Sequence, residues 1–179
     1  GLAGGAAVAG CCAQMVGFAV MSFRENKWGG LVAQGIGTSM LQMPNIVKNP
    51  RIWIPPTLAS AITGPIATCL FKLEMNGAPV SSGMGTCGLV GPIGIIADSG
   101  TSAGTWIGIL LLCVILPGAI SLAVSELMRK IGWIRAGDMK LENWLNCHVH
   151  AYEYFGGVTR LLIPDNLKTG VTKNNRYET

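Results

Sequence analysis

Residues 99–125, SGTSAGTWIGILLLCVILPGAISLAVS, contain no charged side chain and form the most hydrophobic stretch of the chain. A helix needs about 20 apolar residues to cross the hydrocarbon core of a bilayer, which is roughly 30 Å thick. This stretch is therefore long enough to span a membrane as one helix. We expect Pro117 to kink that helix, because proline removes a backbone donor and clashes with the preceding turn.

Two more stretches pass the same test of length and charge. Residues 1–23, GLAGGAAVAGCCAQMVGFAVMSF, and residues 52–71, IWIPPTLASAITGPIATCLF, contain no Asp, Glu, Lys or Arg. As a helix the first would be about 34 Å long, and its small residues suit close packing against other helices. Together with residues 99–125, these stretches predict about three transmembrane helices and an all-α membrane protein.

Two further uncharged stretches are too rich in glycine and proline to form good continuous helices. Residues 28–47 hold four glycines and one proline, and residues 75–97 hold six glycines and two prolines. Irregular backbone at membrane depth is tolerated only where protein buries it or where it lines a water-filled cavity. We therefore interpret both stretches as re-entrant or broken segments that do not cross the membrane.

The positions of the cations support this arrangement. With three spans, seven Lys and Arg side chains would share one side of the membrane and only Lys72 would lie on the other. Cytoplasmic loops carry an excess of Lys and Arg. The basic loops and the tail are therefore expected in the cytoplasm, with residue 1 outside. The seven cations are Arg24, Lys27, Lys48, Arg51, Arg129, Lys130 and Arg135.

Composition changes sharply near residue 137. Only 12% of the chain is charged, against about 25% in soluble domains. Residues 1–137 carry eight Lys/Arg and four Asp/Glu, whereas residues 138–179 carry five of each. The chain begins with Gly1 inside an apolar run, so we expect a truncated sequence. The six cysteines contain no CxxC pair, which supports neither a disulfide scaffold nor a zinc site.

The run GMGTCGLVGPIG, residues 83–94, offers exposed backbone groups and hydroxyls that suit a neutral polyhydroxylated solute. The candidate substrate-binding residues within it are Gly85, Thr86 and Gly88, and Asn49 in the turn before residues 52–71 is another. Glu74 and Asp98 flank the run. Each is either a solvated charge at a loop end or a partner for a substrate hydroxyl, and Glu74 is kept among the candidates.

Several motifs of the first part resemble one protein family. They are NPRIWIPP (residues 49–56), the GP pair at 64–65 and GMGTCGLVGPIG, in order along a stretch that extends to SELMRKIGWIRAGDMKL. The pattern resembles the C-terminal half of the enzyme IIC permeases of the phosphoenolpyruvate-dependent sugar phosphotransferase system, over roughly residues 1–140. The resemblance implies a multi-pass permease in the bacterial inner membrane, without a cofactor, that binds a sugar and is surrounded by lipid.

The same resemblance implies partners and a dependence on further sequence. Such permeases are usually homodimers and work with IIA and IIB components, which supply the phosphoryl group. They have about twice as many membrane residues as this chain. We therefore expect residues 1–137 to be a permease fragment that is inactive alone, and no phosphoryl-carrying residue is identifiable in it.

Residues 138–179 have a different pattern. The spacing of Leu141, Trp144, Tyr152 and Phe155 predicts an amphipathic helix over 139–155, which Asp138 would cap and Gly156 would end. The run VTRLLI (158–163) then predicts a short buried strand. Asp165 follows it, either as an Asx turn with Asn166 or as a carboxylate placed to hold Mg²⁺. His148 and His150 point to different helix faces and are not expected to share a metal.

The stretch HVHAYEYFGGVTRLLIPDNLKTGV, residues 148–171, resembles an internal segment of insertion-sequence transposases. These enzymes carry an Asp-Asp-Glu active site on a ribonuclease-H-like fold. The resemblance implies that Asp165 is the second catalytic, metal-binding acid, with Mg²⁺ as cofactor and nucleic acid as partner. Two-metal catalysis needs all the acids together, and one of three cannot support strand transfer.

Three functions remain open from the sequence. The first is the C-terminal half of a sugar permease (residues 1–137) followed by a truncated transposase-like segment (138–179). The alternative is the remnant of a DNA transposase fused to membrane sequence. The third is a structural role, in which the small-residue helices only oligomerise.

Overall fold

The computed structural model describes residues 1–77, 79–141, 150, 152–154 and 156. These residues form helices and turns, with no strand among them, so the all-α class is confirmed for this part of the chain. The chain divides into two compact units, 1–145 and 146–179. The predicted strand 158–163, together with His148 and Asp165, lies outside the described residues.

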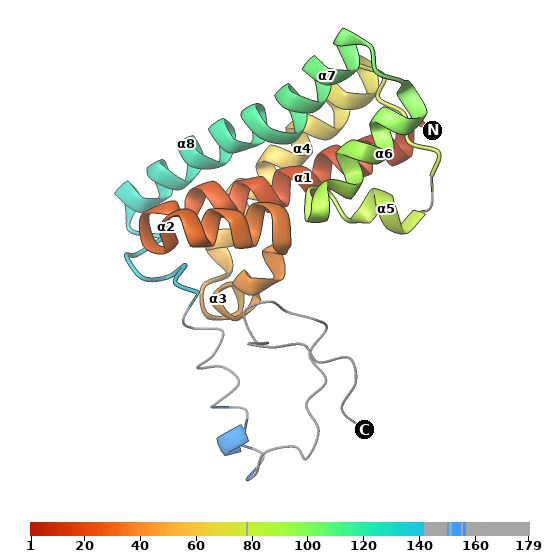
Figure 1. The fold of residues 1–179 in the computed structure, drawn as a ribbon. Coiled ribbons are helices and arrows are strands. Elements are labelled where there is room, and N and C mark those ends of the chain that lie inside the picture. Colours follow the sequence, from red (N-terminus) through yellow and green to blue (C-terminus); the bar gives the residue numbers. More distant parts are fainter. Residues whose placement is uncertain (78, 142–149, 151, 155, 157–179) are drawn as a thin grey trace, which may run out of the picture. The chain divides into compact units, whose positions relative to one another are not determined.

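Three helical elements form the body of the first unit (Figure 1). They are α1 (Leu2–Met21), α4 (Ile54–Cys69) and a continuous helix made of α7 (Ala103–Ile109), the π-helical turn η5 (Leu110–Ile115) and α8 (Leu116–Ile131). Helix α1 contacts both α4 and α8, and α4 also contacts α8. Because the Ser60 hydroxyl donates to the Gly10 carbonyl (2.9 Å) and Gln14 donates to Thr57 (3.3 Å), α4 runs antiparallel to α1.

Small residues allow the three helices to approach closely. Gly17 is buried in α1, and a Cβ atom there would lie 2.7 Å from the Ser121 Oγ and 3.0 Å from the Pro56 Cβ. Small residues at such contacts are typical of helix packing in membranes, where van der Waals contact replaces the hydrophobic driving force. The small-residue pattern of residues 1–23 thus has the packing role that the sequence indicates.

Two helices are long and apolar enough to cross a membrane among the described residues: Leu2–Met21, with 20 residues, and Ala103–Ile131, with 29. The third predicted span, 52–71, is not confirmed by this criterion. Its helix α4 has 16 residues, about 24 Å, and follows a 3₁₀ turn, η3 (Pro50–Trp53). Near Pro117 the helix continues, and the irregularity takes the form of the π-helical turn η5, just before the proline.

Residues 28–47 fold as part of an interrupted helical segment, as their glycines and proline indicate. This first interrupted segment runs from Phe23 to Lys48 and comprises α2 (Phe23–Val32), the π-helical turn η1 (Ala33–Gly37), the 3₁₀ turn η2 (Ser39–Gln42) and α3 (Met43–Lys48). Lys27, with φ of 51°, interrupts α2. Beyond it the chain runs back beside α1, where Gln34 donates to the buried Ser22 hydroxyl (2.7 Å).

Residues 75–97 also contain an interrupted helix. The short α5 (Pro79–Gly83) and the 3₁₀ turn η4 (Cys87–Leu89) precede α6 (Val90–Ser99). Gly88 and Leu89 both have positive φ, 55° and 61°, so the helix cannot continue backwards through them. Both glycine-rich stretches are therefore broken helices packed on α1.

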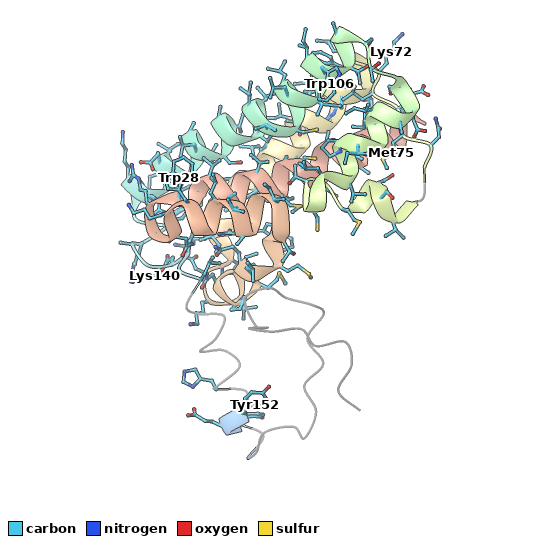
Figure 2. The ribbon with its side chains drawn as sticks, in the orientation of Figure 1. Trp28, Lys72, Met75, Trp106, Lys140 and Tyr152 are labelled. Atoms are coloured by element: carbon cyan, nitrogen blue, oxygen red, sulfur yellow. The ribbon has the colours of Figure 1, made fainter. Side chains whose placement is uncertain are left out.

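The two ends of the helical body differ in charge. The end of α1, the start of α4 and the end of α8 lie together, since Arg51 sits 5.2 Å from the centre of the Trp133 ring and Arg129 pairs with Glu25. Lys72 lies in the loop after α4, at the other end, and Figure 2 shows it far from Lys140. Lys72 thus lies at the opposite end of the helical body from Arg51 and Arg129.

Glu25 organises the basic end. Its side chain is 8% exposed and lies 3.1 Å from the Arg129 guanidinium. The same carboxylate accepts hydrogen bonds from the amides of Gly137 (3.2 Å) and Met139 (3.0 Å). One buried carboxylate therefore fixes the end of α8 and the loop that follows it.

Amide side chains of the first interrupted segment hold the same loop. Asn26 donates to the Met139 carbonyl (2.7 Å) and accepts from the Leu141 amide (3.0 Å). Gln42 also donates to the Met139 carbonyl (3.1 Å), and Asn45 donates to the Lys140 carbonyl (3.2 Å). Met139 is fully buried, so residues up to 141 pack as part of the first unit.

The helix predicted over 139–155 does not begin at residue 139, so this part of the prediction is wrong. Residues 138 and 139 form a turn, and residues 140 and 141 are not helical either, because side chains of the first interrupted segment bind their backbone groups. Asp138 does not cap a helix there; it accepts from the Arg135 amide (2.9 Å) and from Asn49 (2.9 Å). Gly156 has φ of 71°, which suits the expected helix end.

The buried ion pair leads to a prediction about stability. Replacing Glu25 by Gln leaves the Arg129 charge without its partner at a site where the Arg129 side chain is 13% exposed. We expect the free energy of unfolding to fall by about 3–5 kcal/mol, measured by denaturation of the protein in phospholipid nanodiscs.

The matched control is the exposed pair Arg24–Glu126, whose side chains are 65% and 32% exposed. Glu126→Gln should cost at most about 1 kcal/mol. Equal losses in the two variants would show that Glu25 is not the anchor of the basic end.

Candidate functional site

The two interrupted segments meet beside the middle of α1. The turn η1 of the first contacts the turn η4 of the second, and both segments pack against α1 (Figure 1). At this junction Gly85 touches α1 directly, because a Cβ atom there would lie 2.7 Å from the carbonyl carbon of Cys11. Broken helices that meet near the middle of a bundle are where transporters bind their substrates.

Glycine is required at this junction for two reasons. Gly85 and Gly88 each have φ of 55°, a conformation that costs residues with a Cβ atom energy. Gly91 donates its amide to the Gly85 carbonyl (2.9 Å) and lies too close to that carbonyl and to Val8 for any side chain. The glycine pattern thus closes a tight turn and brings it onto α1.

Thr86 lies in this turn with an unusual polar environment. Its side chain is 4% exposed, and its Oγ1 is buried without a hydrogen-bond partner among the described residues. An unpaired buried hydroxyl costs free energy, and a substrate hydroxyl at this position would remove that cost. The structure brings Gly85, Thr86 and Gly88 together in one turn.

The other predicted site residues of the first unit lie elsewhere. Asn49 is at the basic end, where it donates to the Trp133 carbonyl and to Asp138 (2.9 Å each) and caps η3. Glu74 is exposed in the loop at the opposite end, where its backbone binds Ser99. The structure therefore does not bring Asn49 or Glu74 to Thr86.

Asp98, the second acidic residue beside the glycine-rich run, has a structural contact. Its carboxylate accepts hydrogen bonds from the backbone amides of Asn76 and Gly77. These bonds tie α6 to the loop after α4. Asp98 thus orders this end of the molecule and is not directed at the junction.

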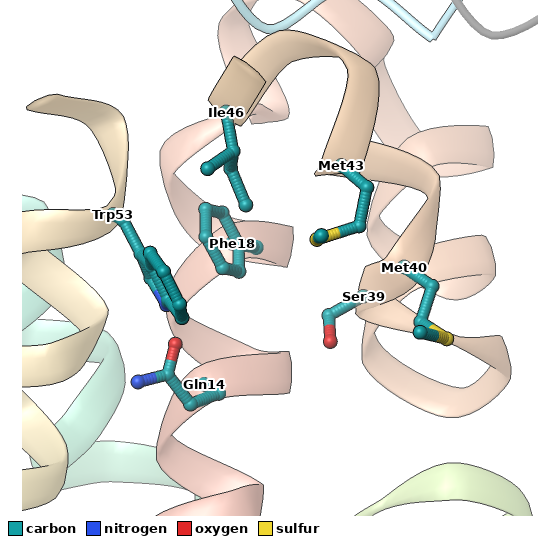
Figure 3. A pocket seen from close by; sticks show the side chains of 7 residues that line it. All are labelled: Gln14, Phe18, Ser39, Met40, Met43, Ile46 and Trp53. Atoms are coloured by element: carbon teal, nitrogen blue, oxygen red, sulfur yellow. The ribbon is translucent and has the colours of Figure 1, made fainter. Parts of the chain in front are cut away.

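A cavity that the sequence does not predict lies beside α1, further toward the basic end than Cys11. It has a volume of about 260 Å³ and seven lining residues (Figure 3): Gln14, Phe18, Ser39, Met40, Met43, Ile46 and Trp53. None of the seven is ionisable. The sequence signal that points to it is a lone glutamine in the middle of the uncharged residues 1–23.

Long apolar helices packed together, with two broken helices meeting beside them, are an arrangement found in helical membrane transporters. Residues 1–141 match the family described as "Phosphotransferase system, EIIC", and the chain belongs to this family. The family is the integral membrane component of the phosphotransferase system. The resemblance seen in residues 1–140 is thereby confirmed, and residues 142–179 lie outside the match.

A second similarity concerns a much shorter stretch. A curated protein of Mycobacterium tuberculosis (strain ATCC 25618 / H37Rv), named as a transposase, is 51% identical over 35 residues. The match covers 20% of this chain and 8% of that protein, so the chain spans a small part of its length. The resemblance to a transposase is confirmed at this level. No solved structure matches the chain.

The unpaired hydroxyl of Thr86 yields a prediction. Thr86→Val keeps the shape of the side chain and removes an unsatisfied polar atom, so thermal stability should be unchanged or higher. The paired control is Ser22→Ala. The Ser22 hydroxyl is fully buried, accepts from Gln34 and donates to the Ala19 carbonyl (3.3 Å).

The control substitution should lower the free energy of unfolding by about 1–3 kcal/mol, because it leaves the buried Gln34 amide nitrogen without its acceptor. Both variants are compared with the parent chain by thermal denaturation in nanodiscs. If Thr86→Val destabilised the protein as much as Ser22→Ala, the Thr86 hydroxyl would have a structural partner and would not be reserved for a ligand.

Proposed function

We propose that this chain is a sugar-transporting part of a phosphotransferase-system permease, corresponding to the C-terminal half of the IIC component. The observation that carries the proposal is the family match over residues 1–141, together with the junction of two broken helices beside α1. Transporters of several folds bind their substrates at such interruptions, because the freed backbone groups become available to the substrate.

The sugar in this proposal binds at the glycine-rich turn. The Thr86 hydroxyl, which has no partner among the described residues, pairs with a sugar hydroxyl. Gly85 lets the turn pack on α1, and Gly88, where a Cβ atom would have only Val90 nearby, lets the backbone approach the ring. No residue from Gly85 to Gly91 is charged, which favours a neutral sugar. Asn49 and Glu74 remain candidates for contacts at the two ends of the transport path.

The proposed topology has three spans: α1, the segment η3–α4, and the helix α7–α8. The basic end, with Arg24, Arg51 and Arg129, faces the cytoplasm, and the loop around Lys72 faces outward. This orientation follows from the excess of Lys and Arg in cytoplasmic loops. The broken segments 28–47 and 75–97 then enter the membrane without crossing it.

The partners in this proposal are the IIA and IIB components, which reach the permease from the cytoplasm and supply the phosphoryl group. A second copy of the permease forms the dimer. The sugar site of such a permease lies between two halves of the membrane domain, so the chain alone is expected to be inactive.

We place the end of the permease part at residue 141, slightly beyond the composition change at 137, because Met139 is buried and its backbone is bound by Glu25 and Asn26. Residues 142–179 then form the transposase-like segment. Asp165 would be its metal-binding acid, with Mg²⁺ and DNA as ligands, and without the other two acids we expect no DNA cleavage.

Transport in membrane vesicles tests the proposed function. A bacterial strain without other IIC permeases would carry the chain alone, or the chain with a separately encoded N-terminal permease half of the same family. We expect sugar uptake driven by phosphoenolpyruvate only in the second case, and a reduction of at least tenfold with Thr86→Val. Uptake by the chain alone would overturn the dependence on the second half, and no uptake of any sugar tested in the combination would overturn the function.

Site-directed labelling tests the topology. In a cysteine-free background, single cysteines at Glu74 and Asp98 should react with a membrane-impermeant maleimide added to intact cells. Cysteines at Lys48 and Lys130 should react only after the cells are opened, because the three spans separate the two ends. Reaction of all four positions from one side would contradict the three-span arrangement.

A further inference from the structure

The cavity between α1, the first interrupted segment and the start of α4 has the chemistry of a sugar subsite. We propose that it binds one neutral pyranose ring, with Trp53 as the stacking surface and the Gln14 amide oxygen as hydrogen-bond acceptor. This inference rests on the proposed sugar-transport function and adds a binding site outside the glycine-rich turn.

The hydrogen bonds around Gln14 fix which end of its amide faces the cavity. The Thr57 hydroxyl donates its proton to the Trp53 carbonyl (2.8 Å). The same oxygen can therefore only accept from Gln14, whose Nε2 lies 3.3 Å away. Because the amide nitrogen is directed at Thr57, the amide oxygen must face the other way.

That amide oxygen has no partner. Gln14 Oε1 is buried and makes no hydrogen bond among the described residues, and Gln14 is one of the residues that line the cavity. Figure 3 shows it next to the Trp53 ring. A buried acceptor without a donor costs free energy wherever water is scarce, and a hydroxyl group of a ligand supplies the missing donor. A lipid chain in the cavity could not do so.

The remaining lining matches the two faces of a sugar ring. The half-exposed Trp53 presents an aromatic surface to the axial C–H groups of a pyranose, and Ser39 places a hydroxyl on the facing wall (Figure 3). Phe18, Met40 and Met43 complete an apolar lining. Such sites combine mostly apolar walls with a few polar groups that fix orientation.

Charge and volume narrow the class of ligand. The lining contains no ionisable residue, which excludes a built-in partner for a sugar phosphate or an acidic sugar. The volume of about 260 Å³ falls just below the range of roughly 300–1,000 Å³ typical of pockets for drug-sized ligands. One ring fits this space better than an oligosaccharide does.

The cavity also has a defined place along the transport path. Gln14 lies one helical turn beyond Cys11, which touches the glycine-rich turn, and Phe18 lies one turn further toward the basic end. A sugar in the cavity would therefore sit between the junction and the basic end. In the proposed topology this position is on the cytoplasmic side, where the phosphoryl group is supplied.

Ligand-induced stabilisation of the full chain tests the inference, since a ligand that binds the folded state raises its melting temperature. The chain is placed in phospholipid nanodiscs, because alkyl glycoside detergents carry the chemistry of the probe. The probes are methyl β-D-glucopyranoside, methyl β-D-galactopyranoside and methyl α-D-mannopyranoside, with the open-chain hexitol mannitol as comparison.

We expect at least one glycopyranoside to raise the melting temperature and mannitol to have a much smaller effect, since an open chain has no flat C–H face. Trp53→Leu and Gln14→Met should weaken that binding at least tenfold, whereas Trp53→Phe should keep most of it. The matched control is Trp28→Leu, because Trp28 is 70% exposed on α2 and lies outside the cavity.

Three results would overturn the inference: no stabilisation by any of the glycopyranosides, equal stabilisation of the Trp53→Leu variant, or stabilisation by oleate in place of a sugar. Its failure is distinguishable from failure of the proposed function. Normal phosphoenolpyruvate-driven uptake in the Trp53→Leu permease would reject the subsite alone, whereas absence of uptake in the parent combination would reject the function.

Discussion

The close packing of α1 is the constraint on which the rest of the structure depends. Helix α4 and the α7–α8 helix pack against it, and both interrupted segments do as well. In a membrane, helix interruptions are possible only where protein covers the freed backbone groups. Gly17 and Gly85 show how this cover is achieved, since neither position has room for a side chain next to its neighbour.

The basic end shows a different solution to the same problem. There the backbone after α8 leaves helical geometry, and the side chains of Glu25, Asn26 and Gln42 bind its amides and carbonyls. A buried carboxylate next to an arginine is costly to desolvate and costly to leave unpaired. Such a pair specifies one arrangement of the loop, which explains why residues up to 141 belong to the permease part.

The middle of α1 contrasts with this end, where the Glu25 carboxylate and the amides of Asn26 and Gln42 have partners. Thr86 Oγ1 and Gln14 Oε1 are both buried, and both lack hydrogen-bond partners among the described residues. Gln14 lies one helical turn beyond Cys11, and Thr86 follows Gly85, which packs against Cys11. The Ser121 Oγ and Arg129 Nε atoms are also buried without partners among the described residues. Ser121, however, lies where α8 packs against Gly17 of α1, and Arg129 belongs to the ion pair with Glu25. Polar atoms left unpaired beside broken helices are what a binding site for hydroxyl groups requires, because the ligand completes the hydrogen bonds.

The sequence by itself determined the helical class, the two long apolar helices, the interruption of both glycine-rich stretches and the grouping of the cations, because each depends on local composition and length. It also located the turn that holds Gly85, Thr86 and Gly88. Only the tertiary structure decided that Asn49 and Glu74 lie at opposite ends, that Met139 is bound by Glu25 and is not helical, and that Gln14 and Trp53 share a cavity. Those facts depend on contacts between residues up to 114 positions apart, which no local pattern contains.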